Sequence, residues 1–480
     1  MDIITLITDL ANDFLTAGDV FCEHPERMAE FEQSLMDASH RTAARFMEMV
    51  LEEVDDLIRK SRTRAERFDI QRRITRTLIT TAGDVTFNQT VYRERETGKY
   101  RCLLEELMRL PGHERFSALA EAKVLSEAEE HSYRHAAESV SYKGQKVSKT
   151  TVMEKIHQIT EELPEPEQAE KKQARVLYIE ADEDHINRQK DEKEGCIIGK
   201  LIYLFEGKQD VCKGRATLIS PHYHGGLYAG SDGNRQMWEE VQKYIEDHYD
   251  TNYLEKVYIT SDGASWIKAG KDYIAKSILV ADKFHLTKYI NRGSKLMMDD
   301  EDDVKAMFYR HIHKNRLEEL KTLLKRILDT TGREDIVNDT MAYFENNWSA
   351  IQRAFRDPEA EGCSAEGHVS HVYSDRMSSR PMGWSERGSD RMCRLRCYVR
   401  NHGRDKIIDL VEYRRNKTFE EAADAATGTD GILADVTKKR TKKQADVAKY
   451  AERMQASIGG LSTGTSVRKI LAIKERLGGI

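Results

Sequence analysis

Three short apolar segments in the middle of the chain each end in an aspartate: Val176–Asp182, Lys256–Asp262 and Ser277–Asp282. Their Val, Ile, Leu and Tyr residues predict buried β-strands, because short apolar runs of this kind fit a sheet that is covered on both faces. Cys196–Phe205 and Arg215–Ser220 predict two further strands between the first two. With a helical pattern over Trp238–His248, this region predicts a mixed α/β domain that carries acids at its strand ends.

The rest of the 480-residue chain changes pattern several times. Apolar residues at helical spacing precede residue 70, β-branched residues follow, and Pro164 and Pro166 interrupt a charged stretch. We expect a helical N-terminal region (1–70), a small β-meander (71–112), a helix-turn-helix (113–160), a linker (161–174), the first part of an α/β core (175–290), a helical insertion (291–360), the second part of the core (361–402) and a helical, basic C-terminal region (403–480).

Composition excludes several classes of protein. Charged residues make up 33% and hydrophobic residues 39%, as in soluble globular proteins, and no apolar run reaches the roughly 18 residues of a membrane helix. The N-terminus lacks the basic and apolar segments of a secretory signal, so we expect a cytoplasmic protein. The seven cysteines form no Cys-x-x-Cys pair, and the His-x-His pairs at His222 and His311 lack Asp or Cys partners at useful spacing, so zinc is not expected.

A helix-turn-helix is predicted before the linker. Ser126–Ser141 predicts one helix, Tyr142–Lys146 a turn that contains a glycine, and Val147–Val152 the start of a second helix. Ser148 is a natural N-cap of that second helix. We expect its first residues to contact DNA, with an ordinary helical hairpin as the equal alternative; they are Ser148, Lys149, Thr150 and Thr151.

The order of the predicted strands and the helix is the outline of a ribonuclease-H-like fold, in which the first and fourth strands lie side by side. Asp182 and Asp262, 80 residues apart, would then lie close together. Two such carboxylates can hold two divalent metals about 4 Å apart, and hard oxygen ligands suit Mg²⁺ or Mn²⁺. The alternative for each acid alone is that it merely ends a strand or caps a helix, and Asp262 with Gly263 also favours a turn.

Four segments together resemble the DDE transposases of the mutator superfamily, with the layout of the ISLre-type group of bacterial insertion sequences. They are LYIEADEDH, VYITSDGASWIK, LVADKFHLTKYI and GCSAEGHVSHVYSDRMSSRPMGW, in this order. The resemblance extends from near Thr75 to about Arg400 and includes the expected meander and helix-turn-helix. Each motif is short and is a weak signal alone. The order of the four motifs, with a helical insertion before the last one, is much more specific than any single motif.

The resemblance implies a catalytic triad of Asp182, Asp262 and Glu366 that binds two Mg²⁺ or Mn²⁺ ions. Glu386 is the rival for the third carboxylate. Glu366 is preferred because small residues surround it and basic residues follow it. Asp184 competes with Asp182, which is preferred because it directly ends the apolar run.

Further residues have auxiliary roles in this interpretation. Glu180 shares a strand face with Asp182 by alternation and would support the metal ligands. Asp282 and His285 match the family's Cys/Asp-x-x-His motif and would flank the DNA path, or else form a helix N-cap with a satisfied histidine. Arg376 and Arg380 would bind phosphates along that path, or else be ordinary surface charges.

These observations predict a multidomain α+β protein whose ribonuclease-H-like core is split by a helical insertion and preceded by a DNA-binding region. The expected activity is a transposase that binds double-stranded transposon ends and cuts and joins DNA as a homodimer or larger complex. Two alternatives stay open: a structure-specific nuclease of the same fold, and a catalytically inactive DNA-binding protein derived from a transposase.

Overall fold

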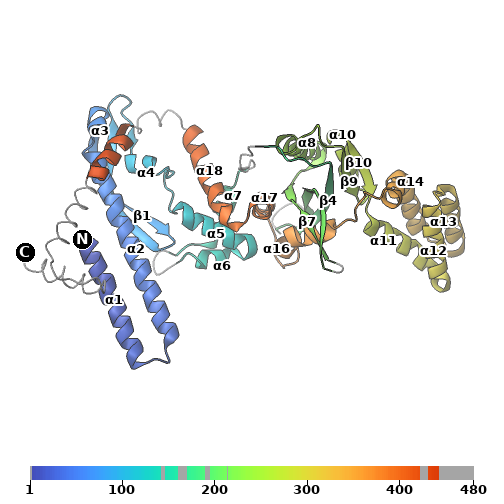
Figure 1. Cartoon of the computed structure of the whole chain (residues 1–480), viewed down its shortest axis with the longest axis horizontal. Coiled ribbons are helices and arrows are strands. Elements are labelled where there is room, and N and C mark those ends of the chain that lie inside the picture. Colours follow the sequence, from blue (N-terminus) through green and yellow to red (C-terminus); the bar gives the residue numbers. More distant parts are fainter. Residues whose placement is uncertain are drawn as a thin grey trace, which may run out of the picture. The chain divides into compact units, whose positions relative to one another are not determined.

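The computed structural model describes residues 3–141, 146–160, 170–189, 195–212, 215–421 and 431–442. These residues fall into two compact units (Figure 1). The first contains residues up to 117 together with the described residues from 415 onward, and the second contains residues 118–141 and 146–414. Most of the predicted turn and linker, 142–145 and 161–169, and the C-terminal residues 422–430 and 443–480 lie outside the described residues.

The first unit combines a helical hairpin with a small sheet. Helices α1 (Ile3–Glu23) and α2 (Met28–Arg59) pack side by side, and α3 (Arg62–Arg67) leads into the sheet (Figure 1). Strands β1 (Phe68–Thr80), β2 (Gly83–Glu94) and β3 (Tyr100–Arg101) form an antiparallel meander, followed by α4 (Leu103–Leu107). The meander lies where the sequence predicts it, although β1 begins within the region expected to be helical.

Three short helices open the second unit: α5 (Ala118–Glu130), α6 (Tyr133–Glu138) and α7 (Lys149–His157). The expected single helix over Ser126–Ser141 is wrong, because the side chain of Ser132 caps α6 by accepting the backbone N–H of His135 and so starts a new helix. The three helices belong to the same unit as the α/β core, since α5 and α7 pack against α17 (Glu386–His402).

A five-stranded mixed sheet forms the centre of the second unit, in the order β10-β9-β4-β5-β8. The strands are β4 (Val176–Asn187), β5 (Cys196–Phe205), β8 (His222–Gly226), β9 (Lys256–Ser261) and β10 (Ser277–Ala281). Strands β4, β5 and β8 are antiparallel neighbours, whereas β9 and β10 run parallel to β4. The predicted strand at Arg215–Ser220 is not part of this sheet: β7 (Arg215–Ile219) pairs only with β6 (Gly207–Cys212), and β8 takes the third place.

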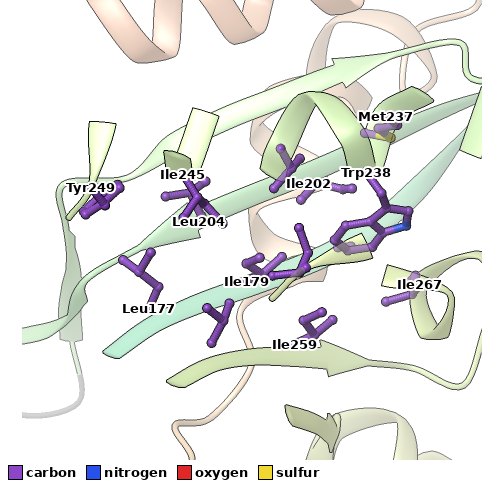
Figure 2. Close-up of a cluster of buried hydrophobic side chains, with 14 of the residues drawn as sticks. Leu177, Ile179, Ile202, Leu204, Met237, Trp238, Ile245, Tyr249, Ile259 and Ile267 are labelled. Atoms are coloured by element: carbon purple, nitrogen blue, oxygen red, sulfur yellow. The ribbon is translucent and has the colours of Figure 1, made fainter. Parts of the chain in front are cut away.

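Helices cover both faces of this sheet. Helix α8 (Gly230–His248) covers one face, where Leu177 and Ile179 of β4 share an apolar cluster with Ile245 and Trp238 of the helix (Figure 2). Because side chains alternate along a strand, Glu180, Asp182 and Asp184 point to the opposite face. That face carries α15 (Ala365–Val369), the π-helical turn η2 (Ser370–Ser374), α16 (Asp375–Met377) and α17.

A helical subdomain lies between β10 and α15. Its elements are α11 (Lys283–Ser294), the 3₁₀ turn η1 (Lys295–Asp300), α12 (Glu301–His313), α13 (Leu317–Thr331) and α14 (Glu334–Arg356), which share their own apolar core. The short helices α9 (Ser265–Lys268) and α10 (Gly270–Tyr273) join β9 to β10, and η3 (Arg404–Lys406) and α18 (Ile407–Glu421) follow α17. None of the described helices is long and apolar enough to cross a membrane.

Candidate active site

Asp182 lies on β4, and Asp262 directly follows the adjacent parallel strand β9. Strands β4 and β9 pair with a constant offset of 80 residues up to Glu180 and Thr260, and the two aspartates come two residues later on each chain segment. Asp182 does not end its strand, because β4 continues to Asn187 in pairing with β5. Asp182 lies in the part of β4 that continues past Glu180, the last residue of β4 that pairs with β9.

The two carboxylates interact electrostatically. Burial raises the pKa of Asp182 to about 6, the backbone N–H of Glu183 opposes this by donating to its Oδ1 at 2.8 Å, and the negative charge of Asp262 raises it further. Both aspartates are half-buried. Like-charged, half-buried carboxylates held together near the carboxyl end of β9 are an arrangement that a divalent cation would stabilise.

Asp282 and His285 belong to the same cluster. Asp282 follows β10 and caps α11, with its Oδ1 accepting the backbone N–H of Phe284 at 2.9 Å. Its Oδ2 lies 2.7 Å from Nδ1 of His285. This hydrogen bond raises the pKa of His285, and the charges of Asp262 and Asp182 act in the same direction. The helix N-cap role of Asp282 is thus present, and its histidine faces the two other aspartates.

Glu180 anchors the segment that precedes Glu366. It is 1% exposed, and its Oε2 accepts the backbone N–H of Ser364 at 2.7 Å and the hydroxyl of Ser364 at 3.1 Å. The hydroxyl of Tyr203 also donates to it, and Lys208 lies 3.3 Å from its other oxygen. Glu180 is therefore a buried attachment point for the start of α15.

Glu366 is an exposed residue in the first turn of α15. The segment before it lies beside the acidic cluster, since burial and the charges of Glu180 and Asp282 all raise the pKa of Cys363. His368 stacks on Tyr203 of β5 with ring centroids 4.4 Å apart. Residues two apart in a helix project in nearly opposite directions, so Glu366 projects away from β5.

The predicted triad is not a preassembled set of three ligands. Within the described part of the chain, one group of three carboxylate, histidine or cysteine ligands has all its ligand atoms within 4.8 Å of one another, and it lies elsewhere, at Glu127, His131 and His135. The structure brings Asp182 and Asp262 together and leaves Glu366 on the neighbouring helix.

The two rival carboxylates have other partners. Asp184 is buried and accepts hydrogen bonds from the hydroxyls of Ser374 at 3.1 Å and Ser378 at 3.0 Å, which tie β4 to η2 and the residue after α16. Glu386 forms an ion pair of 2.7 Å with Arg188. Arg188 is six residues beyond Asp182, which is about 20 Å along an extended strand. Both rivals are thus engaged in other contacts, and the choice of the third carboxylate stays a prediction.

Of the two arginines, Arg376 differs from expectation and Arg380 does not. Arg376 is 2% exposed, donates to the backbone oxygens of Ala128 at 3.2 Å and His131 at 2.8 Å, and lies over the ring of Trp384 at 4.9 Å. Its predicted place along the DNA path is therefore wrong: it joins α16 to the α5–α6 turn. Arg380 stays half-buried at the surface and donates to the backbone oxygen of Glu130 at 2.8 Å.

A basic cavity of about 470 Å³ opens beside Asp262 and His285. Lys268, Lys288 and Arg292 line it. Arg292 pairs with Asp339, whereas neither lysine forms an ion pair within the described part of the chain. Sequence reasoning missed both lysines, although Lys268 lies in the motif that contains Asp262 and Lys288 follows His285 by one helical turn.

The predicted DNA-contacting residues lie at the start of α7. Ser148 caps the helix by accepting the backbone N–H of Thr151 at 3.1 Å, as the sequence predicts. Ser148, Lys149 and Thr150 are exposed and Thr151 is half-buried, while Val152 and Ile156 are buried. The polar start of α7 thus faces solvent, and its contact with DNA stays a prediction.

Comparison with known proteins identifies relatives over most of the chain. The family model described as "Uncharacterised protein family (UPF0236)" matches residues 25–414. A UPF0236 protein of Caldanaerobacter subterraneus subsp. tengcongensis is 33% identical over 395 residues, covering 82% of this chain and 81% of that protein. A second from the same organism is 33% identical over 416 residues, covering 86% and 84%. The name of the first relative joins eleven loci and that of the second joins four. The chain belongs to the UPF0236 family.

Proposed function

We propose that this protein is a DDE-type transposase that cuts and joins the ends of an insertion sequence. The observation that carries the proposal is the pairing of β4 with β9, which places Asp182 beside Asp262 and couples their charges. Adjacent carboxylates of this kind are suited to divalent-metal chemistry on phosphodiesters. Glu366, on the helix that Glu180 attaches to the sheet, is the proposed third carboxylate.

The sheet supports a ribonuclease-H-like core. Strands β4, β5 and β8 pair in antiparallel fashion. Strand β9 pairs in parallel with the other edge of β4, and β10 pairs in parallel with β9. The helical subdomain enters between β10 and α15, the position that the resemblance implies for the insertion. The many loci that share one relative's name favour a mobile element, because such an element multiplies within a genome.

Asp182, Asp262 and Glu366 would hold Mg²⁺ or Mn²⁺. The bound metal would activate the attacking hydroxyl and stabilise the leaving oxygen. The donor set fits hard cations, since every side chain offers carboxylate oxygens. Asp282 orients His285 toward the aspartates, and Lys268 and Lys288 provide positive charge where a DNA phosphate would approach. The exposed start of α7 would bind double-stranded transposon ends, and two ends require at least a homodimer.

The experiment is cleavage and joining of a supercoiled plasmid that carries the element's ends, with Mg²⁺. Asp182→Asn, Asp262→Asn and Glu366→Gln should bind DNA and lose both reactions by at least about a hundredfold. Glu386→Gln is the matched control, because it removes an exposed carboxylate at the distant end of β4, and it should retain activity.

Each other outcome has a defined meaning. Loss of activity in Glu386→Gln with retention in Glu366→Gln would reverse the assignment of the third carboxylate. Cleavage without joining would indicate a nuclease. Binding without cleavage by the wild type in any divalent metal would refute the enzyme and leave a DNA-binding protein.

A further inference from the structure

The turn between α5 and α6 brings three metal-ligating side chains together. Nε2 of His131 lies 4.0 Å and Nε2 of His135 lies 3.7 Å from Oε2 of Glu127. The two imidazole centroids are 4.6 Å apart. All three ligand atoms lie within 4.8 Å of one another, the geometry of a site into which one ion fits.

This gathering depends on the break between the two helices. In a straight helix, Glu127 and His135 would be about 12 Å apart along the axis, too far to share an ion. The chain instead becomes extended at Ser132, whose hydroxyl accepts the backbone N–H of His135 at 3.3 Å, and α6 turns back toward α5. The helix break therefore creates a ligand set that the residue spacing in a single straight helix would not.

The backbone of the turn is held in place by a buried arginine. The guanidinium of Arg376 donates to the carbonyl oxygens of Ala128 and His131, at 3.2 and 2.8 Å. These hydrogen bonds fix the end of α5 and the residue that carries the first imidazole. A fixed backbone lowers the entropy that the ligands lose when they bind an ion.

We propose that Glu127, His131 and His135 form a binding site for a divalent ion of the zinc class, which clasps α5 to α6. Two imidazoles and one carboxylate suit Zn²⁺, Co²⁺ or Ni²⁺, whereas Mg²⁺ prefers oxygen ligands alone. The side chains of Glu127, His131 and His135 are 33%, 49% and 57% exposed, so an ion reaches them from solvent and water completes its coordination. The site is separate from the aspartates proposed for Mg²⁺.

The test is a Zn²⁺ titration of the chelator-treated full-length protein against a chromophoric competitor at pH 7.5. Glu127→Gln, His131→Gln and His135→Gln should each weaken the strongest binding event by at least about tenfold. His371→Gln is the matched control: His371 is exposed and lies 3.2 Å from Asp375 one helical turn away, but this pair offers only two ligands. It should leave the titration unchanged.

A second readout separates binding here from binding by other histidines and cysteines. Stoichiometric Zn²⁺ should raise the melting temperature of the wild type and of His371→Gln but not of His135→Gln. Equal affinity and equal stabilisation in wild type and His135→Gln would overturn the proposal. Plasmid cleavage with Mg²⁺ should be unaltered in the His135→Gln protein, so the zinc site and the proposed transposase activity fail or succeed separately.

Discussion

The carboxylate of Glu180 accepts the backbone N–H of Ser364 at 2.7 Å across 184 residues of sequence. This hydrogen bond attaches the segment that carries Glu366 to the strand that carries Asp182. It also spans the complete helical subdomain between β10 and α15. Glu180 is thus a positioning residue for the candidate site and not a residue expected to touch DNA.

Replacing Glu180 should damage both the fold and the site. Glu180→Ala leaves the backbone N–H of Ser364 and the hydroxyl of Tyr203 without their acceptor, so we expect the free energy of unfolding to fall by about 2–3 kcal/mol. Urea denaturation measures this change. Glu239→Ala, at an exposed position of α8, is the control and should change stability by no more than about 0.5 kcal/mol. An equal effect of both variants would contradict the anchoring role.

The cavity beside Asp262 should contribute to DNA binding through Lys268 and Lys288. We expect the Lys268→Ala/Lys288→Ala protein to bind DNA more weakly, with the slope of log affinity against log salt reduced by roughly 1 for each phosphate that is no longer neutralised. Fluorescence anisotropy across a salt series measures this slope. Lys271→Ala, at an exposed position of α10 outside the cavity, should leave the slope unchanged. A slope unaltered in the double variant would exclude this cavity from the interface.

Arg376 and Arg380 should differ in how much each contributes to the stability of the fold. Arg376→Ala leaves two carbonyl oxygens without their donor, and we expect a loss of about 2–4 kcal/mol in the free energy of unfolding. Arg380→Ala removes one surface hydrogen bond and should cost under about 1 kcal/mol. Thermal and urea unfolding provide the comparison. A stable Arg376→Ala protein with weakened DNA binding would restore the role that the sequence predicts.

The histidines beside α8 should make the protein sensitive to mild acid. Burial lowers the pKa of His224 from 6.5 to about 4, and the charge of His248 contributes. Between these values the unfolded chain takes up a proton that the folded protein does not, so stability falls as the pH drops from 6.5 toward 4. Between pH 7.5 and pH 5, the free energy of unfolding of the His224→Gln protein should fall by about 1–2 kcal/mol less than that of the wild type. Urea denaturation at the two pH values measures this difference. Parallel pH profiles would contradict this assignment.

The apolar strands were predictable because they consist of Val, Ile, Leu and Tyr residues in short continuous or alternating runs. Such runs are typical of strands in a buried sheet. The strand β8 was not, because its residues His222–Gly226 carry no apolar signal. Its burial comes from ring stacking: His222 lies on Tyr244 of α8 with centroids 3.7 Å apart. The predicted strand next to it, β7, has the β-branched pattern but lies outside the central sheet.

Local sequence alone determined the helix caps at Ser148 and Asp282, the meander, the strand that carries Asp182 and the strand that ends before Asp262, because these features depend on neighbouring residues. Only the tertiary structure decided which polar residues stay accessible. Arg376 and Arg380 are chemically alike in sequence, but packing of α5 over α16 buries the first. The meeting of Glu127 with His135 needs both: the local cap at Ser132 breaks the helix, and long-range hydrogen bonds from Arg376 hold the turn in place.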